Sequence, residues 1–193
     1  NLVRGCEQLN DPSIAVLNPA IVWQCAAPGR VVKQTSFRDP RVKAAVAVNP
    51  VSNPIFSAQS MSRVEVPMLV IAGMKDVFAP PVSQQLTPFT GLRQPGSVLA
   101  VQKNGTHLSF LDATSNLPSV ITGPDQPLAR QELRGMAKLF FDRHLLDQVD
   151  TLPLAPVGNG AFRSGSAPLP LLFRSSLTMQ QLETVEPGLK EVP

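Results

Sequence analysis

The chain has 193 residues, of which 43% are hydrophobic and 16% are charged, with a formal net charge of +3. This length suits one domain with a full hydrophobic core, and the composition excludes a chain that is disordered throughout. The most apolar stretches, such as Val66–Ala72, are far shorter than the roughly 20 residues that cross a bilayer. The basic residues are scattered and Tyr is absent, so we expect no nucleic-acid-binding surface.

The first forty residues are irregular, and their main feature is a pair of cysteines. Asn1–Leu9 has the pattern of a helix end, and a turn or a new helix begins at Asp11. Cys6 and Cys25 cannot form a structural zinc site alone, because such a site needs four ligands. In an exported protein they would form a disulfide, and otherwise they would be two small buried thiols. The residues themselves leave both readings open.

Three short apolar segments predict neighbouring strands: Val42–Val48, Met68–Ala72 and Ser97–Val101. Each is a continuous apolar run, which is typical of parallel strands that are buried on both faces. Helical spacing of apolar residues predicts helices over Pro80–Leu92 and Leu128–Leu146. Strands that alternate with helices predict an α/β fold, with a mostly parallel sheet flanked by helices.

The composition changes near residue 150 and divides the chain into two parts. We expect residues 1–150 to form the α/β domain. Four prolines and three glycines fall within residues 150–170, so residues 151–193 predict an extended tail. The amphipathic pattern of Leu177–Val185 predicts a short terminal helix in this tail.

Two polar residues directly follow neighbouring predicted strands. Asp76 lies just after Met68–Ala72, and His107 lies just after Ser97–Val101. The carboxyl ends of parallel strands carry the functional loops of an α/β sheet, and neighbouring strands are about 4.8 Å apart. We therefore expect Asp76 and His107 to form a hydrogen bond. Such a carboxylate orients the imidazole, whose other nitrogen can then act as a general base toward a nucleophile.

Other residues compete for these roles or surround the predicted pair. Asp112 is the alternative acid, and the second histidine, His144, lies late on the predicted helix over Leu128–Leu146. There a histidine suits the negative end of the helix dipole better than it suits catalysis. The candidates for lining an acyl pocket, with simple core packing as the alternative, are Asn49, Phe56, Phe78 and Leu108.

Several segments, together with Asp76 and His107, resemble the second half of an α/β-hydrolase. Asp39–Val51 looks like the strand before the acid strand, while Val66–Gly73 and Gly105–Phe110 resemble the acid strand and the histidine turn. These segments are most similar to the dienelactone-hydrolase-like and platelet-activating-factor-acetylhydrolase-like branch, in particular to its cyanobacterial members. The tails of those members resemble Pro168–Leu171 and Leu177–Leu182. The resemblance covers roughly residues 5–185.

The resemblance implies the carboxyl-terminal part of a partial α/β-hydrolase fold and a serine ester hydrolase of the carboxylesterase, lactonase or lipid-ester type. It implies His107 as the base and Asp76 as the acid. It also favours a disulfide between Cys6 and Cys25, because the family members used for comparison contain a similar cysteine pair. The implied substrate is a small-molecule ester or a lipid-like ester, and neither a metal nor an organic cofactor is needed.

One departure from the family concerns the nucleophile. The family places it in Gly-x-Ser-x-Gly on a strand-to-helix turn, and this motif is absent from the chain. The nearest substitute, Ser164–Ala167, follows no predicted strand. We expect the nucleophile, the oxyanion hole and any signal peptide to lie upstream of Asn1, which follows no Met or leader. The 193 residues alone would then be inactive. The alternatives are a non-catalytic α/β-hydrolase-like binding or interaction protein and an inactive truncated remnant.

Overall fold

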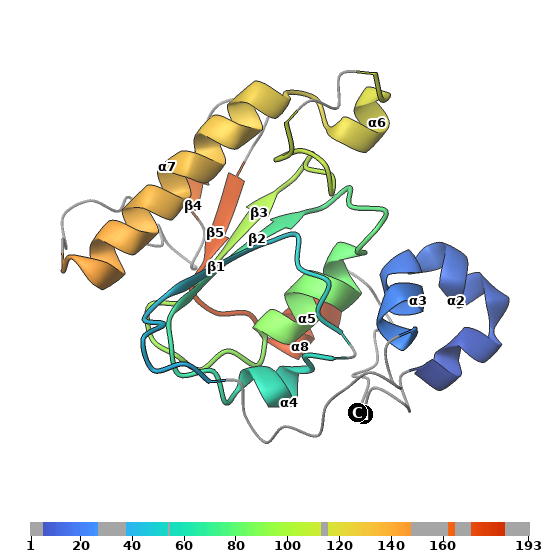
Figure 1. Cartoon of the computed structure of the whole chain (residues 1–193), viewed down its shortest axis with the longest axis horizontal. Helices are drawn as coiled ribbons and strands as arrows, with labels where there is room; N and C mark the ends of the chain where they lie inside the picture. The colour runs from blue at the N-terminus through green and yellow to red at the C-terminus, as the bar shows by residue number, and fades with distance from the viewer. Residues whose placement is uncertain are drawn as a thin grey trace.

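The computed structural model describes residues 6–26, 38–53, 55–112, 116–147, 162–164 and 171–183. Its first part contains the 3-10 helix η1 (Glu7–Asn10) and the helices α2 (Pro12–Leu17) and α3 (Pro19–Cys25). The central part contains β1 (Ala45–Val48), α4 (Ala58–Met61), β2 (Met68–Gly73), the π-helix η3 (Val82–Leu86), α5 (Thr87–Phe89) and β3 (Val98–Gln102). The last part contains α6 (Ser119–Thr122), α7 (Gln126–Leu145), β4 (Phe162–Ser164), β5 (Leu171–Arg174) and α8 (Met179–Glu183) (Figure 1).

The strands form one five-stranded sheet in the order β1-β2-β3-β5-β4. β1, β2 and β3 are parallel, whereas β5 is antiparallel to β3 and β4 is antiparallel to β5. The predicted α/β class is confirmed, and the parallel core consists of the strands that the sequence predicted. β1 is shorter than the predicted segment, because its ladder with β2 covers only Ala45–Val48.

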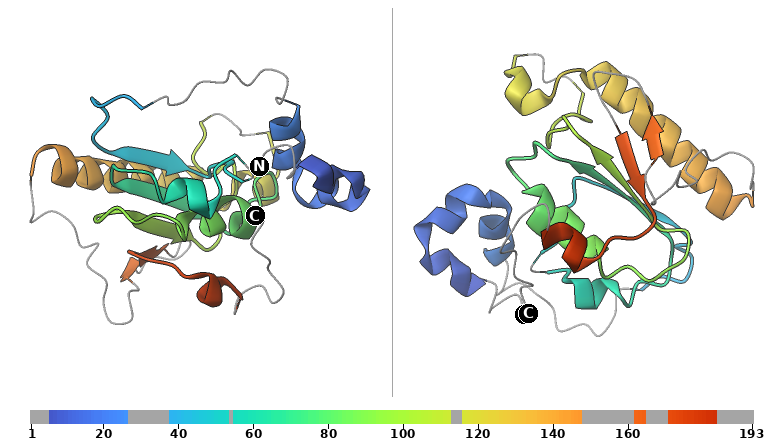
Figure 2. Two further views of the ribbon diagram at one scale, coloured as in Figure 1. Left: turned by 90° about the horizontal axis from the view of Figure 1, so that it is seen from below. Right: turned by 180° about the vertical axis from the view of Figure 1, so that it is seen from behind.

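Both faces of the sheet are covered, which explains the continuous apolar pattern of its strands. Successive strand residues point to opposite faces of a sheet. On one face, Ile71 belongs to a hydrophobic cluster with Phe140 of α7. On the other face, Val70 belongs to a cluster with Phe89 of α5 and Leu182 of α8. Figure 1 and Figure 2 show α7 on one side of the sheet and α5 and α8 on the other.

The segment that we predicted as a tail also contributes to the sheet. In β5, Leu171 and Phe173 are buried, whereas Leu172 and Arg174 are only partly buried. This alternation is typical of an edge-region strand with one face toward the core. The short segment buries its apolar residues only by pairing with β3, and nothing in its own sequence specifies that partner. The tail is therefore part of the domain over residues 171–183.

The predicted helix over Leu177–Val185 is present as α8, which is shorter. Leu182 is almost fully buried against the sheet, so the tail contributes to the core as well as to the sheet. The proline-rich segment predicted over residues 150–170 lies outside the described residues, except for β4. Residues 184–193 also lie outside them.

The amino-terminal helices are tied together by a disulfide. Cys6 and Cys25 form a disulfide, with their Cα atoms 5.5 Å apart. Of the two alternatives that the sequence left open, the structure therefore has the disulfide rather than two free thiols. The backbone N–H of Ala20 in α3 donates to the carbonyl oxygen of Phe78 at 3.1 Å. This contact attaches α3 to the loop that follows β2. The helix end expected over residues 1–9 is described only from residue 6 onward.

The two helices predicted between and after the strands differ in regularity. α7 begins where Asp125 accepts a hydrogen bond from the backbone N–H of Leu128 at 2.9 Å, which is the usual chemistry of a helix cap. The segment predicted as one helix over Pro80–Leu92 is instead η3 followed by α5, and it buries Gln84 and Gln85. Among the helices that the structure describes, none is both long enough and apolar enough to cross a bilayer.

Gly96, in the turn before β3, and Gly135, in α7, provide a matched test of how strongly the backbone and its neighbours restrict a side chain at each position. Gly96 has φ +84°, and a Cβ there would lie 2.6 Å from Cε1 of His144. Gly96→Ala should therefore lower the free energy of unfolding by about 1–2 kcal/mol, because alanine disfavours the left-handed region. A Cβ at Gly135 in α7 would meet no atom beyond its own stretch of helix within 4 Å, so Gly135→Ala should raise the free energy of unfolding by about 0.5–1 kcal/mol.

Chemical denaturation of both variants checks this prediction. A Gly96→Ala protein as stable as the wild type would show that the turn before β3 adapts to a side chain and that His144 does not restrict it.

Candidate active site

The carboxyl ends of β1, β2 and β3 lie at one edge of the sheet, because these strands are parallel. The turn after β2 contains Asp76, and the turn after β3 contains His107. Backbone hydrogen bonds join the turns directly: the N–H of Lys75 donates to the carbonyl oxygen of Gly105 at 2.8 Å. A Cβ at Gly73 would lie 2.7 Å from the same oxygen. The close approach of the two turns therefore depends on glycine at position 73.

Asp76 is buried, and each of its carboxylate oxygens accepts hydrogen bonds from the protein. Oδ1 accepts from the backbone N–H groups of Phe78 at 2.9 Å and Ala79 at 2.8 Å. Oδ2 accepts from Nε2 of Gln85 at 2.9 Å and lies 2.7 Å from Nδ1 of His107. A buried carboxylate needs such donors to offset its lost hydration. They also fix the plane of the carboxylate relative to the imidazole.

The imidazole of His107 is held in one tautomer by this contact. Nδ1 faces a carboxylate oxygen, which only accepts, so Nδ1 carries the proton and Nε2 of the neutral ring is the acceptor. The side chain of His107 is 27% exposed, and no described residue forms a hydrogen bond with Nε2. The ring of Phe78 lies 5.7 Å from the imidazole, centroid to centroid. The arrangement presents a basic nitrogen beside an apolar ring.

Asn49 connects the ends of all three parallel strands. It follows β1, its φ is +45°, and it is buried. Its Oδ1 accepts from the backbone N–H of Gly73 at 2.9 Å. Its Nδ2 donates to the carbonyl oxygens of Thr106 at 2.9 Å and His107 at 3.3 Å. We predicted Asn49 as a pocket residue, and the structure places it as a clamp behind the turns that carry Asp76 and His107.

The histidine turn has a further polar support. The backbone N–H of Thr106 donates to Oγ of Ser109 at 2.8 Å, and Oγ1 of Thr106 donates to the carbonyl oxygen of Ile121 at 2.6 Å. Thr106 and Ser109 are buried, and the hydrogen bond to Ile121 attaches the turn to α6. His107 is therefore held from both sides of its turn.

The remaining predicted residues lie in different places. Phe78 contacts His107 as described, and Leu108 is half-buried in the next position. Phe56 is 53% exposed and lies in the loop after β1. The side chain of Asp112, the alternative acid, is 86% exposed and lies 3.5 Å from Arg130. The carboxylate that contacts His107 is thus that of Asp76.

The sequence analysis missed Gln85. Its Nε2 donates both to Oδ2 of Asp76 and to the carbonyl oxygen of Ala79, so it locks the loop onto the carboxylate. A glutamine in a predicted amphipathic helix carries no distinctive signal, because its buried position depends on how η3 meets the loop after β2. A search for polar residues on the apolar side of that helix could have identified it.

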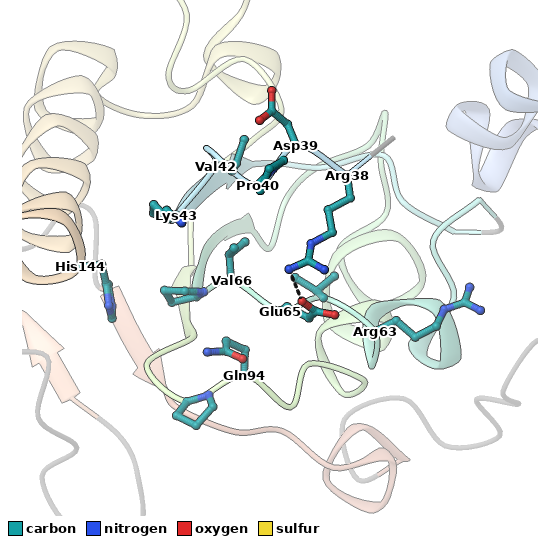
Figure 3. Close-up of a pocket in the computed structure, with 13 residues that line it drawn as sticks. Arg38, Asp39, Pro40, Val42, Lys43, Arg63, Glu65, Val66, Gln94 and His144 are labelled. Carbon is teal, nitrogen blue, oxygen red and sulfur yellow. Dashed lines mark ion pairs between the residues drawn. The ribbon is translucent and has the colours of Figure 1, made fainter. Parts of the chain in front are cut away.

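A wide cavity of about 1160 Å³ lies at the opposite end of the parallel strands. Figure 3 shows its lining, which comes from segments that precede β1, β2 and β3 and from His144. Arg38 and Glu65 form an ion pair of 2.5 Å within it. Because Asp76 and His107 lie at the carboxyl ends of the strands, this cavity is not the place of their chemistry.

Comparisons with protein-family models, with curated proteins and with solved structures found no match for this chain. The α/β-hydrolase assignment therefore stays a hypothesis, which depends on the residues quoted above and on the contact between Asp76 and His107. Within the described ranges, no group of three or more His, Cys, Asp or Glu side chains is placed to hold a metal ion.

Substitutions at Asn49 test the clamp. Asn49→Ala removes three hydrogen bonds, so it should lower the free energy of unfolding by about 3 kcal/mol, at about 1 kcal/mol for each bond. Asn49→Gly loses the same bonds but tolerates the positive φ, so its loss should be smaller by about 1 kcal/mol. Urea denaturation measures both values. Equal stability of Asn49→Ala and the wild type would contradict the clamp.

His144 gives a prediction of pH dependence. Burial is the main cause that lowers the pKa of His144, the neighbouring charge of Arg143 lowers it further, and a hydrogen bond with the backbone of Gly96 opposes both. A histidine with a lowered pKa in the folded state stabilises the fold when neutral, and this contribution is lost as the pH falls below the unfolded value of about 6.5.

The wild type should therefore lose more stability on acidification from about pH 7.5 to about pH 5.5 than His144→Gln does. Both proteins contain His107, so the comparison of their melting temperatures isolates the contribution of His144. The same pH slope in both proteins would show that His144 is not the titrating group.

Proposed function

We propose that this chain is the part of an α/β-hydrolase that carries the acid and the base of a serine ester hydrolase. In this proposal His107 is the general base, Asp76 orients it and balances its charge, and the substrate is a small-molecule or lipid-like ester. The observation that carries the proposal is the contact of 2.7 Å between Oδ2 of Asp76 and Nδ1 of His107, with Nε2 left as the acceptor.

The surroundings of the pair support a catalytic role over a purely structural one. A histidine with a purely structural role does not require a buried carboxylate beside it. Asp76 is such a carboxylate, and three further donors hold it in place. Burying a carboxylate is costly unless it is fully hydrogen-bonded, and a protein can avoid that cost with an apolar residue. A buried carboxylate is useful where the imidazole must become positively charged during a reaction, because it stabilises that charge.

The chemical steps follow from the tautomer. Nε2 of His107 would take the proton of a serine hydroxyl as its oxygen attacks the ester carbonyl carbon, and the carboxylate of Asp76 would stabilise the imidazolium. When the tetrahedral intermediate collapses, Nε2 would return this proton to the leaving alkoxide. Water, activated by the same nitrogen, would then hydrolyse the acyl-enzyme. None of these steps needs a metal ion.

The nucleophile is assigned to residues outside this chain. The sequence contains no Gly-x-Ser-x-Gly, and no described hydroxyl or thiol is hydrogen-bonded to Nε2 of His107. The same observation favours a second function, a non-catalytic α/β-hydrolase-like binding protein that retains the pair without turnover. The two functions differ in whether a serine reacts, and labelling with a fluorophosphonate probe decides between them.

The test uses the complete translation product that includes this chain. Wild-type protein should be labelled by a fluorophosphonate and should hydrolyse p-nitrophenyl butyrate. His107→Ala should lose both properties, and Asp76→Asn should lower kcat by about three to four orders of magnitude, because the imidazole then adopts the wrong tautomer. The matched control is His144→Ala, which should retain wild-type kcat.

Two results would overturn the proposal. Absence of labelling and of ester hydrolysis in the wild type would favour the binding protein. Hydrolysis that continues in His107→Ala at the wild-type rate would show that another group is the base. Circular dichroism of each variant separates loss of activity from loss of fold.

A further inference from the structure

The wide cavity at the amino ends of the parallel strands is lined by charged side chains, and only some of them are paired. Its volume of about 1160 Å³ has room for a small organic molecule. The charged residues that line it are three cations, Arg38, Lys43 and Arg63, and two carboxylates, Asp39 and Glu65. Because Asp76 and His107 lie at the opposite end of the strands, this cavity needs an explanation of its own.

Both carboxylates in the cavity are already paired with arginines. Glu65 forms an ion pair of 2.5 Å with Arg38. Asp39 forms one of 2.6 Å with Arg41 and also accepts a hydrogen bond from the backbone N–H of Arg41 at 2.9 Å. These contacts hold the negative charge of the cavity close to positive charge, so little of it is left to neutralise other cations.

The two remaining cations, Lys43 and Arg63, have no such partner. No ion pair joins either of them to another residue in the part of the chain that the structure describes. Both are exposed, so a molecule in the cavity can reach them. The cavity therefore has an excess of positive charge, which attracts an anion and disfavours a cation.

Apolar side chains form another part of the lining. Val42 is 49% exposed although it is apolar, and Val66 and three prolines also line the cavity. Figure 3 shows Val66 and His144 toward the side of the cavity that carries Lys43. An inorganic anion would use only the charge of the cavity, whereas an anion with an apolar body would also cover this apolar surface.

We propose that this cavity is a binding site for an aliphatic carboxylate. The carboxylate group would accept hydrogen bonds from Nζ of Lys43, and the aliphatic chain would lie against Val42 and Val66. An ammonium group suits a single carboxylate, because it is a compact charge with three donors. The site is separate from Asp76 and His107, and the proposal does not depend on ester hydrolysis.

The two histidines of the chain report on binding, because one lines this cavity and the other lies at the opposite end of the strands. The test titrates the 193-residue chain with octanoate and follows the Cε1–H signals of His144 and His107 by NMR. Burial lowers the pKa of His144, so its ring is neutral at about pH 7.5 and does not supply the charge that is tested. The His144 signal should shift with saturation, while the His107 signal should stay unchanged.

Two further ligands separate the effect of the charge from that of the chain. Octanamide has the shape of octanoate without its charge, and inorganic phosphate has charge without an aliphatic chain. Each should bind at least about tenfold more weakly than octanoate. Equal affinity for octanamide would contradict the role of Lys43, and equal affinity for phosphate would contradict the role of the apolar wall.

Three variants test the residues that the proposal names. Lys43→Gln removes the cation and keeps much of the side chain, so it should raise the octanoate Kd by about tenfold and leave the octanamide Kd unchanged. Lys103→Gln is the matched control, because Lys103 is exposed and follows β3 at the opposite end of the strands. It removes the same charge and should leave the octanoate Kd unchanged. Val42→Ser removes apolar surface and should raise the octanoate Kd by about fivefold.

The proposal is overturned if octanoate shifts neither histidine signal, or if it shifts both equally. It is also overturned if Lys43→Gln and Lys103→Gln have the same octanoate Kd. All three substituted residues are exposed, and thermal melts verify that each variant is folded. If Lys43→Gln does not fold, a raised octanoate Kd in Val42→Ser supports the site, and a wild-type Kd there overturns it.

Discussion

The side chain of Asn49 is the constraint on which the arrangement of the candidate site depends. It joins the end of β1 to the end of β2 through the N–H of Gly73 and to the histidine turn through two carbonyl oxygens. A side-chain amide is suited to this place, because it has both an acceptor and two donors. The φ of Asn49 is +45°, and asparagine adopts this left-handed region more readily than most residues do. Without this residue, the turns that carry Asp76 and His107 would be joined only by the contact between those two side chains and by backbone hydrogen bonds.

The buried carboxylate imposes a second constraint on the loop after β2. The buried carboxylate of Asp76 accepts hydrogen bonds from the backbone N–H groups of Phe78 and Ala79 and from the amide of Gln85, and a buried carboxylate is costly without such donors. The hydrogen bonds of this one side chain therefore constrain the path of the chain from β2 into η3. The same path brings the ring of Phe78 against His107 and lets α3 attach to the loop through Ala20. Folding and the geometry of the site are thus coupled.

Much of the fold could be predicted because the strands are buried on both faces. Their continuous apolar runs predicted β1, β2 and β3, and the residues at their carboxyl ends predicted that Asp76 and His107 would lie together. β5 could not be recognised in the same way. Its short alternating segment lies among prolines and glycines, and only pairing with β3 identifies it as a strand. Gln85 was missed because burial of a helix residue depends on the neighbours that the helix finds.

The sequence by itself determined the α/β class, the positions of the parallel strands along the chain and the identity of the residues that follow them. These features are local, since each depends on a run of apolar residues and on what comes directly after it. Only the tertiary structure decided that Asn49 supports the turns behind the site, that Gln85 orients Asp76, and that residues 171–174 complete the sheet. These roles depend on hydrogen bonds between residues far apart in the chain, and such bonds leave no periodic pattern in the sequence.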